Sequence, residues 1–160
     1  MLKLLALFTV LISGISNPIA KPEIIATPIP FFEAQIQHQY VAPVSEYAAG
    51  HRGIDFVLPM NGSIQSPVSG TIHFKGLVVD RDVVTIQSRD GKLFSFEPAC
   101  TQLEVGHKVL KGEFFATHCS PERSFRYHCE SCVHYSVRTN FGYLSPMYFY
   151  GSLQPSRLSA

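Results

Sequence analysis

The feature that most constrains the fold is a series of short apolar or alternating runs that begins at residue 54 and continues almost to the C-terminus. Successive side chains of a β-strand point to opposite faces, so short runs of this kind, bounded by turn residues, are typical of strands. After the first 20 residues, no long stretch has apolar residues at the 3.6-residue spacing of an amphipathic helix. The pattern predicts an all-β domain, as a strongly curved sheet or a sandwich. The expected strands span residues 54–57, 70–74, 83–87, 93–96, 108–110, 113–116 and 133–138.

One pair of these strands has an evident turn between them. The dipeptide Asp90-Gly91 separates the expected strands 83–87 and 93–96. Asp-Gly favours the left-handed backbone that a tight hairpin needs, so it is a signal for a two-residue turn. We therefore expect these two strands to be neighbours in the sheet.

The N-terminus has the composition of an export signal. Lys3 precedes an apolar run over residues 4–15, and small residues then offer cleavage after Ser16 or Ala20. The apolar run is about a dozen residues long, whereas a membrane span needs roughly 20. We therefore expect residues 1–20 to be a signal peptide and the mature protein to be secreted or associated with the cell envelope.

The rest of the chain divides by composition. Residues 21–39 contain three prolines and predict an extended N-terminal arm, because proline disfavours helix at and before its position. Residues 40–150 hold the expected strands, and residues 151–160 form a tail. Hydrophobic residues make up 46% of the chain, which is enough for a packed core. The formal net charge is +1 with no basic stripe, which argues against a nucleic-acid partner.

Four cysteines are present, at positions 100, 119, 129 and 132. An even number in an oxidising compartment favours disulfides, but four cysteines allow three connectivities and sequence alone does not choose among them. A structural zinc knuckle is the alternative, because His118-Cys119 and the segment 128–132 (HCESC) form a compact cluster. The export signal favours disulfides over the knuckle.

Two distant segments carry the ligand types of a catalytic zinc site. Residues 50–55 read GHRGID and supply His51 and Asp55, and the expected strand 133–138 supplies His134. Two histidines and one carboxylate, with a fourth position for water, are a recurrent set for catalytic zinc. Residues four apart in an extended strand are separated by roughly 13 Å, so Gly53 must permit a bend between the first two ligands. The remaining histidines at positions 38, 73 and 107 have no partner in the sequence and are expected to be surface or satisfied polar residues.

These segments together resemble the lysostaphin/LytM-type zinc endopeptidases, which cleave peptide bonds in bacterial peptidoglycan. The matching landmarks are residues 51–55, 67–72 (PVSGTI), 105–113 (VGHKVLKGE), the strand with His134, and 143–146 (YLSP). The resemblance covers roughly 100 residues and implies an antiparallel β-sheet groove. It also implies that His51, Asp55 and His134 bind zinc.

The chain departs from that family at two positions. Two further histidines usually stand near the metal, and here Cys132 and Glu97 occupy their places. The pattern resembles an actinobacterial-looking subgroup with Glu-Pro and Cys-x-His at these positions. The resemblance to the subgroup implies a Cys119–Cys132 disulfide and leaves open whether Cys100 and Cys129 are bonded.

The departures leave three readings of function. The first is an exported, monomeric zinc endopeptidase acting on peptidoglycan peptides, with Glu97 either as the base that activates water or as a residue that orients a ligand. Tyr127, Tyr135, His118 or His128 would then supply a donor. The second is a catalytically degenerate module that binds wall peptides or regulates another wall hydrolase. The third, a lipoyl- or biotinyl-like carrier, is weak because the expected hairpin lysine is absent.

Overall fold

The computed structural model describes residues 25–119 and 131–151. The expected signal peptide lies outside the described residues, as does all but the first residue of the expected tail. The described residues form ten strands and two short 3-10 helices and contain no α-helix, which confirms the all-β class. None of their helices is long and apolar enough to cross a membrane.

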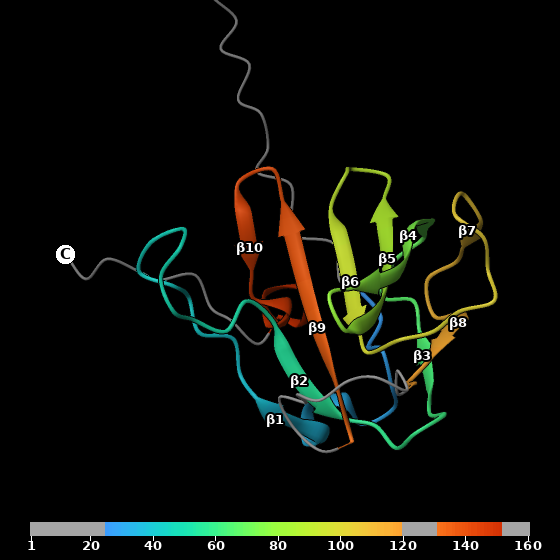
Figure 1. Cartoon of the computed structure of the whole chain (residues 1–160), viewed down its shortest axis with the longest axis horizontal. Coiled ribbons are helices and arrows are strands. Elements are labelled where there is room, and N and C mark those ends of the chain that lie inside the picture. Colours follow the sequence, from blue (N-terminus) through green and yellow to red (C-terminus); the bar gives the residue numbers. More distant parts are fainter. Residues whose placement is uncertain (1–24, 120–130, 152–160) are drawn as a thin grey trace, which may run out of the picture.

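Eight strands form one antiparallel sheet, and two more form a small second sheet (Figure 1). Strand β9 is central, with β6 along one edge and both β2 and β10 along the other. The main sheet runs β1 (Ile36–His38), β2 (Ile54–Val57), β9 (Cys132–Thr139), β6 (Leu93–Glu97), β5 (Arg81–Ser88), β4 (Gly70–Val78) and β7 (Lys108–Val109), with β10 (Gly142–Leu144) beside β9. The second sheet pairs β3 (Ser63–Gln65) with β8 (Phe114–Thr117), and the 3-10 helices are η1 (Phe32–Gln35) and η2 (Pro146–Tyr150).

Every run expected to be a strand is one, with ends shifted by a few residues. Three strands were not expected: β1, β3 and β10. Each has only three residues, which is too short for an alternating pattern to be recognised. Two of these, β1 and β10, are held by pairing with longer strands of the main sheet.

The Asp90-Gly91 hairpin is where the sequence placed it, but its loop is one residue longer. The Ser88 amide donates to the Lys92 carbonyl, and the Gly91 amide donates back to the Ser88 carbonyl. Residues 89–91 therefore form a three-residue loop, with Gly91 at a φ of +83°. A type I turn followed by a left-handed glycine is the usual geometry of such a loop.

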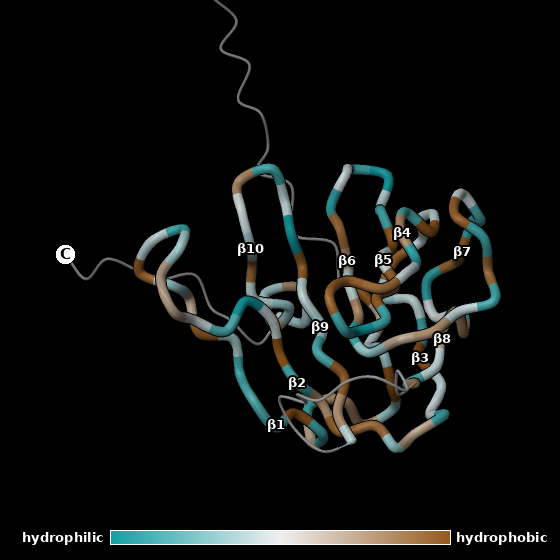
Figure 2. The backbone as a smooth tube through the Cα atoms, in the orientation of Figure 1, coloured by the Kyte–Doolittle hydropathy of each residue, from teal (hydrophilic) through white to brown (hydrophobic). Residues whose placement is uncertain are grey.

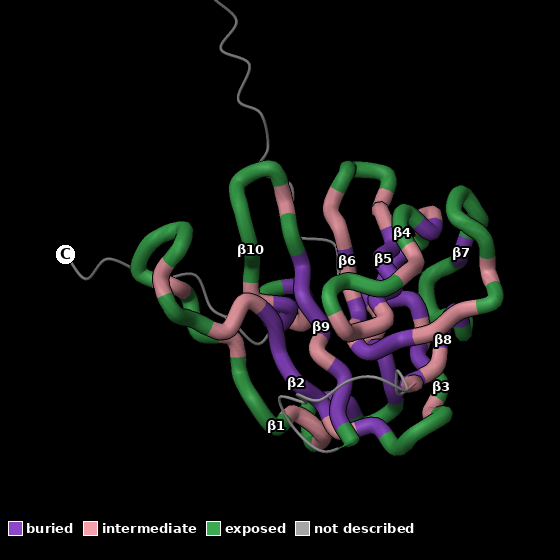
Figure 3. The backbone as a smooth tube through the Cα atoms, in the orientation of Figure 1, coloured by how far each residue is buried: buried purple, intermediate pink, exposed green. Residues whose placement is uncertain are grey.

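The main sheet has one buried face and one face that carries polar groups. On β9, Val133, Tyr135 and Val137 are fully buried, and the intervening residues from His134 on lie on the other face. The Tyr135 ring stacks on Phe96 of β6, with centroids 4.6 Å apart. The tube representations show apolar, buried segments in the middle of the sheet and exposed segments at the hairpin ends, of which the end between β5 and β6 is polar (Figure 2 and Figure 3).

Part of the expected N-terminal arm belongs to the folded domain. Ile25, Ile29 and Phe32 are buried in the same core as the sheet, and the Phe32 ring packs edge-on against Phe56 at 5.3 Å. Directly after them, β1 adds an edge strand to β2. Residues 25–38 are thus anchored by both apolar burial and backbone pairing.

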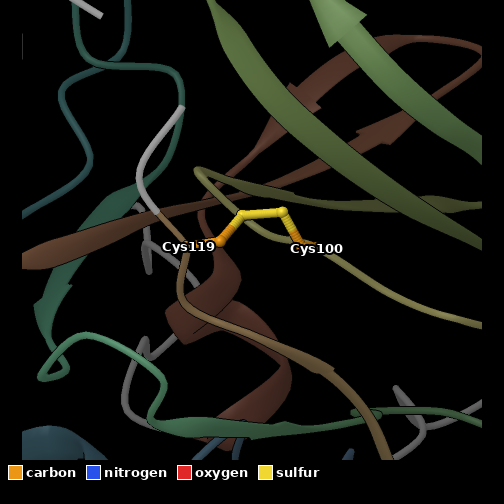
Figure 4. Close-up of a disulfide and its surroundings, with 2 residues drawn as sticks. All are labelled: Cys100 and Cys119. Atoms are coloured by element: carbon orange, nitrogen blue, oxygen red, sulfur yellow. A yellow bond between two sulfur atoms is a disulfide. The ribbon is translucent and has the colours of Figure 1, made fainter. Parts of the chain in front are cut away.

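A disulfide joins Cys100 to Cys119, with Cα atoms 5.7 Å apart (Figure 4). The expected Cys119–Cys132 pairing is therefore wrong. Cys100 and Thr117 exchange two backbone hydrogen bonds of 2.9 Å, which bring Cys119 alongside Cys100, whereas Cys132 lies opposite Val57 at the start of β9. Cys132 is itself disulfide-bonded, and Cys129 lies outside the described residues. With Cys119 and Cys132 in disulfides, the zinc-knuckle alternative loses two of its three thiolates.

Candidate metal centre

The three expected ligands come together on one face of the main sheet. Asp55 of β2 and His134 of β9 are direct cross-strand partners, so their side chains share a face. His51 precedes β2 and is held by two backbone hydrogen bonds of 2.9 Å with Val41. The chain bends between His51 and Asp55, as the sequence required.

The ligand atoms converge on a small volume. Asp55 Oδ1 lies 2.7 Å from His134 Nδ1 and 3.1 Å from His51 Nε2, and the two nitrogens lie 3.1 Å apart. One ligand atom from each residue falls within 4.8 Å of the others. Two imidazole nitrogens and one carboxylate oxygen, in a tight group near the surface, fit the donor set of a catalytic zinc site.

Gly53 makes room for His134 in this cluster. A Cβ built at Gly53 would lie 2.5 Å from His134 Nε2 and 2.5 Å from the Tyr135 carbonyl oxygen. No side chain larger than hydrogen fits in that space without a shift of the neighbouring strand. The sequence indicated that Gly53 permits a bend, and the structure adds that it admits the third ligand.

The protonation states suit a cation. His51 Nδ1 is 2.7 Å from the Gln39 carbonyl oxygen, which can only accept, so Nδ1 carries the proton and Nε2 is left to face the cluster. Burial by itself would raise the pKa of Asp55, but hydrogen bonds and positive charge outweigh it and lower that pKa below 3.8. The partners responsible are His134, His51 and His38. The carboxylate is thus ionised near neutral pH.

A row of four polar residues crosses the sheet at this level. His38 is the registered partner of Asp55, Asp55 of His134, and His134 of Glu97, so the four lie on adjacent strands β1, β2, β9 and β6. Registered partners in antiparallel strands point to the same face. Glu97 therefore lies beside the cluster, as expected from the sequence, and its side chain is 23% exposed.

The structure adds two residues that sequence reasoning did not place here. His38 Nδ1 lies 3.0 Å from Asp55 Oδ2, at one end of the row. Arg81 Nη1 lies 3.4 Å from Glu97 Oε1, at the other end. Neither residue belongs to a recognisable spacing with the ligands, because only the pairing of strands brings them to the site. The other two histidines considered, His73 and His107, are exposed, as expected.

Two of the donors considered from the sequence are not available on this face. Tyr135 is fully buried on the opposite face of the sheet, and burial raises its pKa well above 10. His118 is also buried, and its Nδ1 lies 2.6 Å from the Leu58 carbonyl oxygen. Tyr127 and His128 lie outside the described residues. Arg81 and His38 are the residues with N–H groups that strand pairing places at the two ends of the row.

A second group of potential ligands does not form a comparable site. Asp82 lies close to the sulfurs of Cys100 and Cys119. Both sulfurs are in the disulfide and cannot act as thiolate ligands. Among the described residues, the cluster of His51, Asp55 and His134 is the one with a ligand set suited to zinc.

The comparisons with known proteins agree with this fold. No family model matches the sequence. An uncharacterized protein of Mycobacterium tuberculosis is 31% identical over 74 residues, which are 46% of this chain and 30% of that protein. An uncharacterized protein of Mycobacterium bovis matches to the same extent. The match thus spans less than a third of the length of these relatives.

Solved structures resemble the chain over more of its length. Lysostaphin from Staphylococcus simulans has a TM-score of 0.64 at 19% identity, covering 83% of this chain and 55% of that chain. A zinc-containing peptidase from Vibrio cholerae has a TM-score of 0.58 at 17% identity, covering 76% and 39%. A chain of the SpoIIQ–SpoIIIAH pore-forming complex has a TM-score of 0.62 at 15% identity, covering 81% and 92%.

These likenesses define the class of fold. The chain has the all-β fold shared by lysostaphin and M23 peptidases. At identities below 20% the similarity speaks for architecture, so activity has to be argued from the site. The assignment to a divergent subgroup stays a prediction.

Proposed function

We propose that the chain is an exported zinc-dependent endopeptidase that cuts peptide bonds in peptidoglycan peptides. The observation that carries this proposal is the convergence of His51, Asp55 and His134 on one sheet face, with Glu97 on the adjacent strand. The export signal expected over residues 1–20 and the peptidase-like fold support the location and the substrate class. The folded domain would act as a monomer, secreted or at the cell envelope.

Each residue of the row would have a defined task. Bound zinc would acidify a water molecule and polarise the scissile carbonyl. Glu97, across from His134, would accept the proton of the attacking water and pass it to the leaving amine. Arg81 would bring N–H donors to the Glu97 end of the row, where charge develops on the carbonyl oxygen. The competing role for Glu97 is to orient the ligand His134.

A degenerate binding or regulatory module is the second candidate. Cys132, in the place of one usual histidine, is buried and disulfide-bonded, so it cannot donate a proton. One structural neighbour is a chain of a pore-forming complex of two proteins. Such a module would hold wall peptides, or contact another wall hydrolase, without turnover.

The experiment that decides between them starts with metal content. Zinc per chain is measured on the oxidised, signal-free protein and on His134→Ala, which should lose the metal. Purified peptidoglycan is then digested with the wild type and with Glu97→Gln, and new amino termini are counted. Release by the wild type that Glu97→Gln abolishes supports the peptidase. Zinc binding and sedimentation with peptidoglycan, without release, would support the module instead. A folded wild type without zinc would refute the metal centre.

A further inference from the structure

Strand β1 contains a bulge that changes which of its residues faces the metal centre. Ile36 pairs with Phe56 and His38 pairs with Asp55, so two steps along β1 correspond to one step along β2. In a regular antiparallel ladder Gln37, and not His38, would lie opposite Asp55. Bulges of this kind occur next to active sites, where they redirect a side chain. Here the extra residue turns the imidazole of His38 toward the carboxylate.

The two oxygens of Asp55 have different surroundings. Oδ1 faces the cluster and contacts His134 Nδ1 and His51 Nε2. Oδ2 faces away from it and contacts His38 Nδ1 at 3.0 Å. The Asp55 side chain is only 3% exposed, so this second oxygen depends on a protein donor to replace water. An ionised carboxylate accepts only, which makes His38 the donor.

The next residue of the same segment acts on a second ligand. The carbonyl oxygen of Gln39 receives the Nδ1 proton of His51 at 2.7 Å, which leaves His51 Nε2 toward the cluster. Two consecutive residues thus hold two of the three ligands. Their segment is fixed at its start by burial of Phe32 and along its length by pairing with β2.

We propose that His38 is a positioning residue for the metal centre: it fixes the Asp55 carboxylate so that Oδ1 alone is presented to the metal. This inference rests on the proposed zinc site and adds a role for the N-terminal arm in building it. Groups that hydrogen-bond a metal ligand typically change metal affinity by about 10–100-fold when they are removed. His38 lies outside the group of atoms that fall within 4.8 Å of one another, so it orients a ligand and is not a fourth one.

A cavity beside His38 reaches two of the three ligands, His51 and Asp55. It has a volume of about 440 Å³ and is lined by Gln37, His38, Gln39, Val41, His51 and Asp55. His38 stands at its wall with a side chain 54% exposed, so its replacement need not disturb the core. This exposure is what makes the role testable by mutation.

The test measures zinc affinity directly. The oxidised, signal-free chain is titrated with zinc in competition with a chromophoric chelator, for the wild type, His38→Ala, His38→Asn and His73→Ala. The amide nitrogen of asparagine can occupy the place of His38 Nδ1, so this variant keeps the donor, while His73 is an exposed histidine in β4. We expect His38→Ala to bind zinc at least about 10-fold more weakly. His38→Asn should remain within about threefold of the wild type, and His73→Ala should be unchanged.

Each outcome bears on a separate claim. Wild-type affinity in His38→Ala would overturn the positioning role and leave the zinc site standing. Equal losses in His38→Ala and His38→Asn would also overturn it, because the donor would then be irrelevant. A wild type that binds no zinc would overturn the proposed function together with this inference. Circular dichroism and thermal melting of the metal-free variants show that the fold is retained.

Discussion

Replacement of Gly53 by alanine tests whether close packing at this position sets the geometry of the metal centre. The added Cβ would meet the Tyr135 carbonyl oxygen and His134 Nε2, both at 2.5 Å, which is about 0.9 Å short of ordinary contact. Rotation of the imidazole can relieve one contact, but the other is to the backbone of the paired strand β9. The φ of Gly53 lies outside the left-handed range, so the cost is steric and not conformational.

The magnitude follows from that overlap. Forcing one extra carbon into a well-packed place costs about 1–3 kcal/mol, and we expect this loss in the unfolding free energy of the metal-free protein. A shift of His134 by several tenths of an ångström also exceeds the tolerance on metal–ligand distances, which is about 0.2 Å. We therefore expect zinc affinity to fall at least about 10-fold.

Two measurements and one control check this reasoning. Urea unfolding followed by circular dichroism gives the stability, and competition with a chelator gives the zinc affinity. Gly91→Ala is the control, because Gly91 has a φ of +83° and no atom within 4 Å of an added Cβ. That variant should lose about 1–2 kcal/mol through backbone strain and keep its zinc affinity. Wild-type stability and affinity in Gly53→Ala would refute the packing argument.

Three further predictions concern other parts of the structure. Because the folded-state pKa of Asp55 is lowered from 3.8, its ionisation stabilises the metal-free protein above that pH. The unfolding free energy should therefore fall as the pH drops below 3.8, and Asp55→Asn should lack this contribution in acid unfolding curves. The Cys100–Cys119 disulfide closes a loop with a sequence separation of 19, so replacing both cysteines by serine should cost roughly 3 kcal/mol in urea unfolding. His118 is 1% exposed and its Nδ1 lies 2.6 Å from the Leu58 carbonyl, so His118→Ala should cost about 2–4 kcal/mol by thermal or urea unfolding.

Each of these has a result that would contradict it. Parallel acid unfolding curves for the wild type and Asp55→Asn would contradict the lowered pKa. The serine variant keeps the disulfide of Cys132, so its stability is compared with that of the oxidised wild type, and equal stability of the two would contradict the disulfide argument. His107→Ala is the matched control for His118, because its side chain is exposed and its loss should be nearly neutral.

The sequence determined the class of fold and most of the sheet. Strands of four or more residues have an alternating or continuous apolar pattern, because each has one face or both faces in the core. It also named His51, Asp55 and His134 as a group and put Glu97 beside them. The pattern works here because residue type and strand period are local properties.

The tertiary structure decided which residues surround the ligands and which cysteines pair, and local sequence patterns do not contain this information. The bulge that turns His38 toward Asp55, and the pairing of β5 with β6 that brings Arg81 near Glu97, depend on the register between strands. The pairing of Cys100 with Cys119 likewise depends on a single bridge between residues 100 and 117. Register fixes which side chains meet across a sheet, and a step of one residue moves every side chain to the other face. The sequence therefore supplied the ligands, and the pairing of strands supplied their surroundings.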